Sequence, residues 1–121
     1  GYCWVILGLF LTGVSALGFL PLSIALHAFT AGAIGSMTLG MMCRVTLGHT
    51  GRDKIATGLT KLSFFLMQGA AFMRVFGMII APDYSIEWII GSATLWVICF
   101  ALYILIFAPM LCKPDLDEQV A

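Results

Sequence analysis

The chain has 121 residues, of which 61% are hydrophobic and 10% charged, and its six basic and six acidic side chains leave no net charge. A soluble domain carries about a quarter charged residues, so a water-soluble fold of this composition would lack a polar surface. The composition therefore predicts an integral membrane protein. The zero net charge points to no nucleic-acid partner, and we expect none.

Four segments are long enough to span the membrane. Crossing ~30 Å of hydrocarbon takes about 20 apolar residues, and residues 2–20, 24–47, 55–81 and 86–108 meet this requirement. The fold class predicted is all-α, with about four transmembrane helices in one membrane region. Pro109 is expected to end the last helix, and a polar tail occupies 109–121. The chain starts without methionine almost inside an apolar run, so we expect part of a longer polytopic bundle.

Basic residues near helix ends predict the orientation, because they are enriched on the cytoplasmic side. Arg44, Arg52 and Lys54 flank the second connection, and Lys113 lies in the tail. We therefore place the turn around residues 48–54 and the C-terminus in the cytoplasm. Pro21 and Pro82 then lie on the outer side.

Small residues at a spacing of four mark one face of the segment 24–47. Ala28, Gly32, Ser36 and Gly40 form this ridge, and such ridges allow membrane helices to approach closely. We interpret the ridge as packing and expect this helix to be central.

His27 lies near the outer end of the same helix, with Ala31 and Ile34 on its face. A neutral imidazole is a common ligand of haem iron, copper or zinc. The alternative is a hydrogen bond from His27 to a neighbouring helix. The sequence leaves both interpretations open.

His49 cannot share a metal ion with His27, because a continuous helix rises ~33 Å between them at ~1.5 Å per residue. With Arg52 it lies in a glycine-bracketed turn, Gly48 to Arg52, where backbone and side chains can hold an anionic group. The alternative is a helix that is capped by Gly48 and followed by an interfacial basic turn.

Arg74 is predicted at about the depth of His27, in the third helix. An arginine inside a membrane costs at least ~2.5–3.5 kcal/mol unless it is paired or snorkels to the surface. Asp83 and Glu87 lie farther out. A haem propionate is a suitable partner, because arginine binds carboxylates in a bidentate manner; snorkelling is the alternative.

The sulfur-containing and aromatic residues are less informative. The four cysteines show no paired CxxC spacing, so we interpret them as small apolar residues. The seven methionines form no tight cluster and fit helix interfaces. Tryptophans are interpreted mainly as interfacial anchors. No nucleophile elbow, P-loop or HExxH motif occurs, so hydrolysis and phosphoryl transfer lack support.

Two consecutive stretches resemble the NnrS family of membrane proteins. They are residues 27–42 (HAFTAGAIGSMTLGMM) and 44–52 (RVTLGHTGR). Family proteins have about a dozen membrane helices, so the resemblance implies that this chain is the C-terminal portion of one. Its partners would be the lipid bilayer and the remaining helices or other membrane subunits.

The resemblance also implies a multi-pass protein of the bacterial inner membrane that binds haem and copper and serves the nitric oxide response linked to denitrification. It carries over the motif residues His27, Arg44, His49 and Arg52. With Arg74, these are the predicted cofactor-binding residues, and His27 is the predicted metal ligand. The resemblance implies no single reaction, so whether the protein is an enzyme stays open.

Two other functions fit the sequence. A transporter segment would use broken helices around a midplane site, and Gly32, Gly35 and Gly40 would permit a break, but the midplane has no ionisable residue. A cofactor-free accessory subunit of a respiratory complex would instead use His27 and Arg74 to bond a partner helix.

Overall fold

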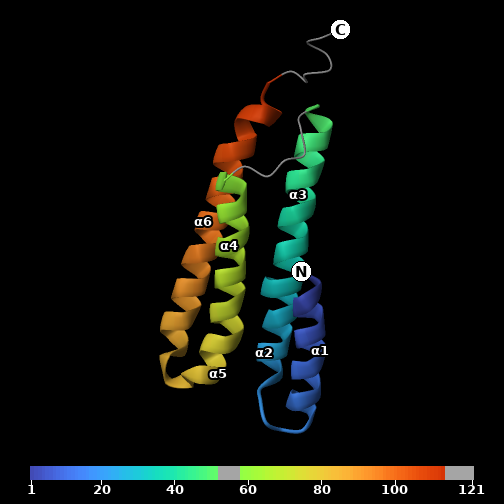
Figure 1. Cartoon of the computed structure of the whole chain (residues 1–121). Coiled ribbons are helices and arrows are strands. Elements are labelled where there is room, and N and C mark those ends of the chain that lie inside the picture. The colour runs from blue at the N-terminus through green and yellow to red at the C-terminus, as the bar shows by residue number, and fades with distance from the viewer. Residues whose placement is uncertain (52–57, 114–121) are drawn as a thin grey trace.

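The computed structural model describes residues 1–51 and 58–113, and all regular structure within these ranges is helical (Figure 1). Three helices are long and apolar enough to cross a membrane: Leu22–His49, Gly58–Ile80 and Pro82–Leu111. A shorter apolar helix, Tyr2–Ala16, precedes them. The prediction of an all-α membrane fold is confirmed.

Helix α1 (Tyr2–Ala16) is shorter than the segment 2–20 that hydropathy marks out. It ends in a turn at Gly18, whose φ of 84° lies in the left-handed region that favours glycine. Pro21 then precedes α2. As a result, α1 lies beside only the first half of the next long helix, as Figure 1 shows.

The second long helix is continuous but not uniform. It consists of α2 (Leu22–His27), the π-helical η1 (Ala28–Ile34) and α3 (Gly35–His49). The third consists of α4 (Gly58–Phe72), the π-helical η2 (Met73–Gly77) and α5 (Met78–Ile80).

The last long helix begins with a 3₁₀ turn, η3 (Pro82–Tyr84), and continues as α6 (Ser85–Leu111). Pro109 does not end this helix, contrary to the prediction. Proline lacks an N–H donor and its ring crowds the carbonyl four residues earlier, but the helix continues for two residues beyond it. The backbone N–H of Cys112 still donates to the Ala108 carbonyl at 3.0 Å, which closes the final turn.

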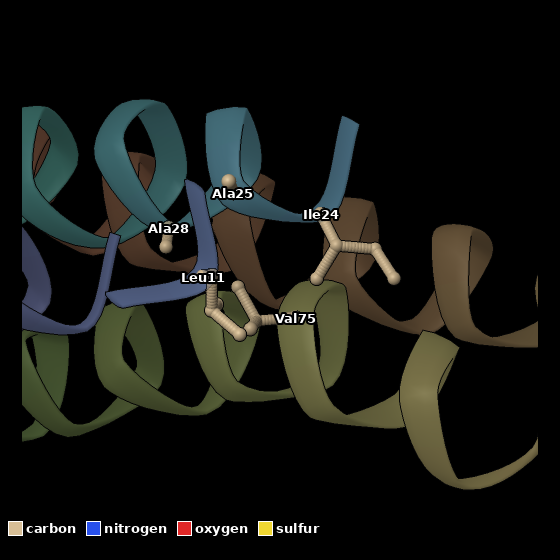
Figure 2. Close-up of a cluster of buried hydrophobic side chains, with 5 residues drawn as sticks. All are labelled: Leu11, Ile24, Ala25, Ala28 and Val75. Atoms are coloured by element: carbon tan, nitrogen blue, oxygen red, sulfur yellow. The ribbon is translucent and has the colours of Figure 1, made fainter. Parts of the chain in front are cut away.

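Two helix pairs make the bundle. The α4 helix packs along α6, and α1 packs on α2 and η1; the pairs meet where α4 contacts η1 and η2 contacts α2. One buried cluster lies near the end of the bundle at which α2 begins, and Figure 2 shows its residues, Leu11, Ile24, Ala25, Ala28 and Val75. A second cluster, nearer the other end, consists of Leu39, Cys43, Met67, Cys99 and Phe107.

The small-residue ridge packs as predicted at Ala28, Gly32 and Ser36, which are buried. At Gly32 the approach is so close that an added Cβ would overlap the indole ring of Trp4. Trp4 is therefore a partly buried packing residue of the bundle, whereas the sequence suggested an interfacial anchor. Its Nε1–H donates to Gln68 Oε1 at 2.7 Å, and Gln68 Nε2 donates to Ser36 Oγ at 2.7 Å.

Replacing Gly32 with alanine should destabilise the bundle. The new Cβ must displace the Trp4 ring, and overpacking of this kind typically costs about 1–3 kcal/mol. Thermal unfolding of the detergent-solubilised protein measures the effect. The matched control is Gly13→Ala, because an added Cβ there meets nothing within 4 Å; equal melting temperatures for the two variants would contradict the close contact.

Candidate functional site

A groove of about 410 Å³ lies between three segments that are distant in the sequence. The end of α2 and the start of η1 supply His27, Thr30 and Ala31, and η2 supplies Arg74. The α6 helix supplies the facing wall, which consists of Ser92, Ala93, Trp96 and Val97. The two ionisable residues predicted at one depth therefore meet in one groove.

These residues lie directly before and within irregular turns, respectively. His27 is the last residue of α2, directly before η1, and Arg74 lies within η2. Short π-helical segments are rare and frequently occur at functional sites. The wider turn also changes which residues share a face: Ala31 lines the groove with His27, whereas Ile34, predicted on that face, is 59% exposed.

The imidazole of His27 has an uncommitted nitrogen. Its Nδ1 atom is buried and has no hydrogen-bond partner in the part of the chain that the structure describes. The Ser23 backbone lies near the ring, but not with the geometry of a hydrogen bond. A buried polar atom without a partner costs about 1–3 kcal/mol, so this nitrogen is available for a ligand.

The guanidinium of Arg74 is also uncommitted. The side chain is half-buried, and within residues 1–51 and 58–113 it makes neither a hydrogen bond nor an ion pair. Asp83 and Glu87 are exposed and do not pair with it. Arg74 lies close enough to His27 for their charges to interact. The groove therefore offers an unpartnered imidazole nitrogen and a guanidinium whose positive charge has no matching anion among the described residues.

The remainder of the groove is apolar in effect. The hydroxyl of Thr30 donates to the Leu26 carbonyl at 2.9 Å, and that of Ser92 donates to the Ala70 carbonyl at 2.8 Å. Both hydroxyl protons are thus committed elsewhere. Trp96 supplies an aromatic surface and packs on Phe100, with ring centroids 4.5 Å apart. The site combines one imidazole and one guanidinium with a flat hydrophobic wall.

The other predicted site residues lie elsewhere. Arg44 is exposed and lines a separate hollow of about 430 Å³ with Tyr2, Met37, Gly40, Met41 and Phe64. At ~1.5 Å per residue, it is about 25 Å along the helix from His27. His49 is exposed at the end of α3. Arg52 lies outside the described residues.

The end of α3 differs from the predicted Gly48 cap. Gly48 is still within the helix, which ends at His49. The hydroxyl of Thr50 donates to the Thr46 carbonyl at 2.8 Å, and Gly51 adopts a left-handed φ of 63°. The Thr50 hydroxyl thus satisfies one of the last carbonyls of the helix. The glycine in the left-handed conformation is Gly51, three positions after the expected Gly48.

Sequence reasoning missed the α6 wall. Trp96 was interpreted as an interfacial anchor, but it lies well inside α6 and lines the groove. Hydropathy shows that α6 is apolar around its whole circumference, so it carries no signal for which face meets His27.

The donor set of the groove suits some metal groups better than others. The described residues contain no cluster of three or more His, Cys, Asp or Glu side chains able to hold a metal ion. A haem needs fewer protein ligands, because its macrocycle supplies four nitrogens and the protein adds an axial ligand such as histidine. One imidazole, one guanidinium for a propionate and a flat apolar wall fit this group.

Comparison with known families decides the family of the chain. The NnrS protein family model matches residues 1–115. The chain belongs to the NnrS family. Nothing among curated protein sequences or solved structures matches it. The match confirms the resemblance and covers the groove, both core clusters and all three membrane-length helices of this NnrS chain.

If the groove is open space, a large side chain should enter it without penalty. We expect Ala93→Phe, on the exposed groove wall, to change stability by no more than ~0.5 kcal/mol. Ala70→Phe is the matched contrast, because Ala70 is buried where α4 meets α6, and overpacking there should cost about 1–3 kcal/mol. Thermal unfolding of both variants tests this, and similar losses would show that the groove is filled by packing.

Proposed function

We propose that this NnrS-family protein binds haem in the groove between α2–η1, η2 and α6, and that it serves the nitric oxide response linked to denitrification. The observation that carries the proposal is the unpartnered His27 ring beside the unpaired Arg74 guanidinium in an otherwise apolar groove. The link to nitric oxide rests on the family resemblance.

Each residue has a distinct part in this proposal. If haem is bound here, His27 would hold the iron through a ring nitrogen, and Arg74 would hold a propionate through a charge-assisted, bidentate hydrogen bond. Trp96, Ala93 and Val97 exclude water from the macrocycle face. The bound haem supplies an iron that binds diatomic gases and changes oxidation state.

Copper, which the resemblance also implies, fits His27 less well. Copper sites in proteins use several nitrogen or sulfur donors, and His27 is the sole histidine of the groove. We therefore assign His27 to haem. No contact among the described residues favours a transporter segment or a cofactor-free subunit.

Removing the proposed axial ligand should remove the cofactor signal. In the detergent-solubilised full-length protein, we expect His27→Ala to lose or shift the Soret band and to lower the iron content per protein. Arg74→Gln should keep the axial ligand but weaken haem retention about tenfold or more, since a charge-assisted hydrogen bond contributes about 1.5–3 kcal/mol. Reduced-minus-oxidised spectra and metal analysis provide the measurement.

Arg44→Gln is the matched control for Arg74→Gln. It removes the same charge from a membrane helix, but Arg44 lines a different hollow, so the haem spectrum should stay unchanged. A spectrum unaffected by His27→Ala would rule out His27 as the ligand. A folded wild-type protein without haem or iron would favour the accessory-subunit function.

We further propose that the protein lies in the bacterial inner membrane, with the α3–α4 turn and the C-terminus in the cytoplasm. The basic residues Arg44 and Lys113 lie near the C-terminal ends of α3 and α6, whereas the acidic Asp83 and Glu87 lie in η3 and in the first turn of α6, at the opposite end of that helix. Positive charge is retained on the cytoplasmic side.

Thiol labelling tests this orientation. The native Cys112 is exposed next to the C-terminal end of α6, so a membrane-impermeant maleimide should label it only after spheroplasts are lysed. A cysteine introduced at Asp83, which is exposed at the opposite end, should react in intact spheroplasts. The reverse pattern would invert the orientation.

A further inference from the structure

We propose that the hollow lined by Arg44 is a binding site for an anionic phospholipid. Arg44 and Lys61 hold the lipid phosphate, and an acyl chain lies on the apolar surface between α3 and α4. The hollow is separate from the groove at His27, and the proposal does not rest on haem binding.

The hollow lies where α1 no longer covers the second long helix. Gly1, directly before α1, packs on Met37, because an added Cβ there would lie 2.8 Å from the Met37 Cγ atom. The α3 helix continues from Met37 to His49, and Figure 1 shows the N-terminus beside the middle of this long helix. The hollow has a volume of about 430 Å³, within the usual range of ~300–1,000 Å³ for small-molecule sites.

The walls of the hollow are mostly apolar. Met37 and Met41 come from α3, where they are 37% and 69% exposed, and Phe64 comes from α4. Gly40 lies between them without a side chain, and an added Cβ there would meet only the Phe64 ring, at 3.7 Å. Flexible methionine side chains adapt to irregular apolar shapes. This surface therefore suits a hydrocarbon chain.

Two basic residues lie at one depth beside this surface. The contact between Gly40 and Phe64 aligns α3 with α4, and these helices run in opposite directions, as Figure 1 shows. Arg44 follows Gly40 by four residues, and Lys61 precedes Phe64 by three. Residues three or four apart are neighbours on a helix surface. Arg44 and Lys61 thus both lie about one turn beyond the contact, toward the end of α3.

Neither positive charge is neutralised by the described part of the chain. Arg44 and Lys61 are exposed, and within residues 1–51 and 58–113 they make neither a hydrogen bond nor an ion pair. The acidic residues of these ranges, Asp83 and Glu87, lie in η3 and in the first turn of α6. The hollow therefore combines an apolar surface with two cations that lack a counter-ion.

The depth of the cations points to a lipid headgroup. Arg44 is five residues before the end of α3 at His49, which corresponds to about 8 Å. Long basic side chains near a helix end extend toward the headgroup layer, and basic pockets between membrane helices attract anionic headgroups.

The chemistry of the site selects the class of lipid. Arginine binds two phosphate oxygens in a bidentate manner, and lysine adds a point charge. A zwitterionic headgroup carries an ammonium group that the second cation repels, so a lipid with net negative charge is favoured. Free inorganic phosphate satisfies the cations but leaves the apolar surface uncovered.

The test is native mass spectrometry of the delipidated, detergent-solubilised full-length protein, titrated with dioleoyl phosphatidylglycerol or dioleoyl phosphatidylcholine. We expect wild-type protein to retain one phosphatidylglycerol at least about fivefold more tightly than phosphatidylcholine. Arg44→Gln and Lys61→Gln should each weaken retention of phosphatidylglycerol about fivefold, the usual effect of one basic residue on an anionic lipid, and leave phosphatidylcholine unchanged.

Two further variants separate the site from general surface charge. Lys113→Gln is the matched control, because Lys113 is an exposed basic residue after α6 that does not line the hollow, and it should retain phosphatidylglycerol as wild type does. Gly40→Leu keeps both cations but places a side chain in the hollow, so it should weaken retention of both lipids.

The measurements on wild-type protein need no variant and cover the case in which a substitution prevents folding. Equal retention of phosphatidylglycerol and phosphatidylcholine would overturn the proposal, and so would an equal loss in Lys113→Gln. Displacement of phosphatidylglycerol by millimolar inorganic phosphate would show a plain anion site and also overturn it. Failure of wild-type protein to retain any lipid would show that protein fills the hollow.

Discussion

Inside a bilayer, a polar group can be satisfied only by other protein groups, and the bundle depends on this constraint. Most described polar side chains obey it: Gln68 links Trp4 to Ser36, Thr46 meets Tyr103, and Ser92 bonds the Ala70 carbonyl. These bonds tie α1 to α4, α4 to α3, and α6 to both α3 and α4. Against this background, the two ionisable side chains of the groove stand out, because neither the Nδ1 atom of His27 nor the guanidinium of Arg74 has a hydrogen-bond partner within residues 1–51 and 58–113. Among the described residues, the indole N–H of Trp88, which packs against Gly77, is also buried without a partner.

The two π-helical segments explain how the groove forms without a break in either helix. A wider turn lets one residue step out of the regular 3.6-residue repeat while the ladder of backbone hydrogen bonds continues. In η1 and η2 the step occurs beside His27 and at Arg74. Both side chains can therefore approach α6 while the chain still packs closely at Gly32 and Val75. In hydrocarbon this is a less costly solution than an unwound turn, whose free N–H and C=O groups would have no water to bond.

Composition and hydropathy were sufficient to predict the membrane fold and the common depth of His27 and Arg74, because burial in lipid leaves a direct mark on the sequence. Of the four predicted spans, three are helices of membrane-spanning length, and the first is the shorter helix α1. Composition and hydropathy could not predict which face of each helix meets its neighbours, because that depends on how the helices are rotated about their own axes. A uniform 3.6-residue repeat placed Ile34 beside His27, and only the π turn moves it away. The α6 helix is apolar all round, so nothing in its sequence marks Trp96 as a wall residue or Cys99 as the neighbour of Cys43. The end of α3 was also not predicted. The Thr50 hydroxyl bonds the Thr46 carbonyl, so the helix continues beyond Gly48, the glycine expected to cap it.

The length of α6 has a consequence for how the protein sits in its bilayer. Its 27 residues extend about 40 Å, whereas the hydrocarbon core is ~30 Å thick. Hydrophobic mismatch of this size is relieved by tilting the helix or by thickening the lipid around it. Since α4 packs along α6, a tilt would carry the whole hairpin with it and bring the Arg74 side of the groove closer to one headgroup layer. The protein should therefore respond to acyl-chain length, and thicker membranes would favour a more upright bundle.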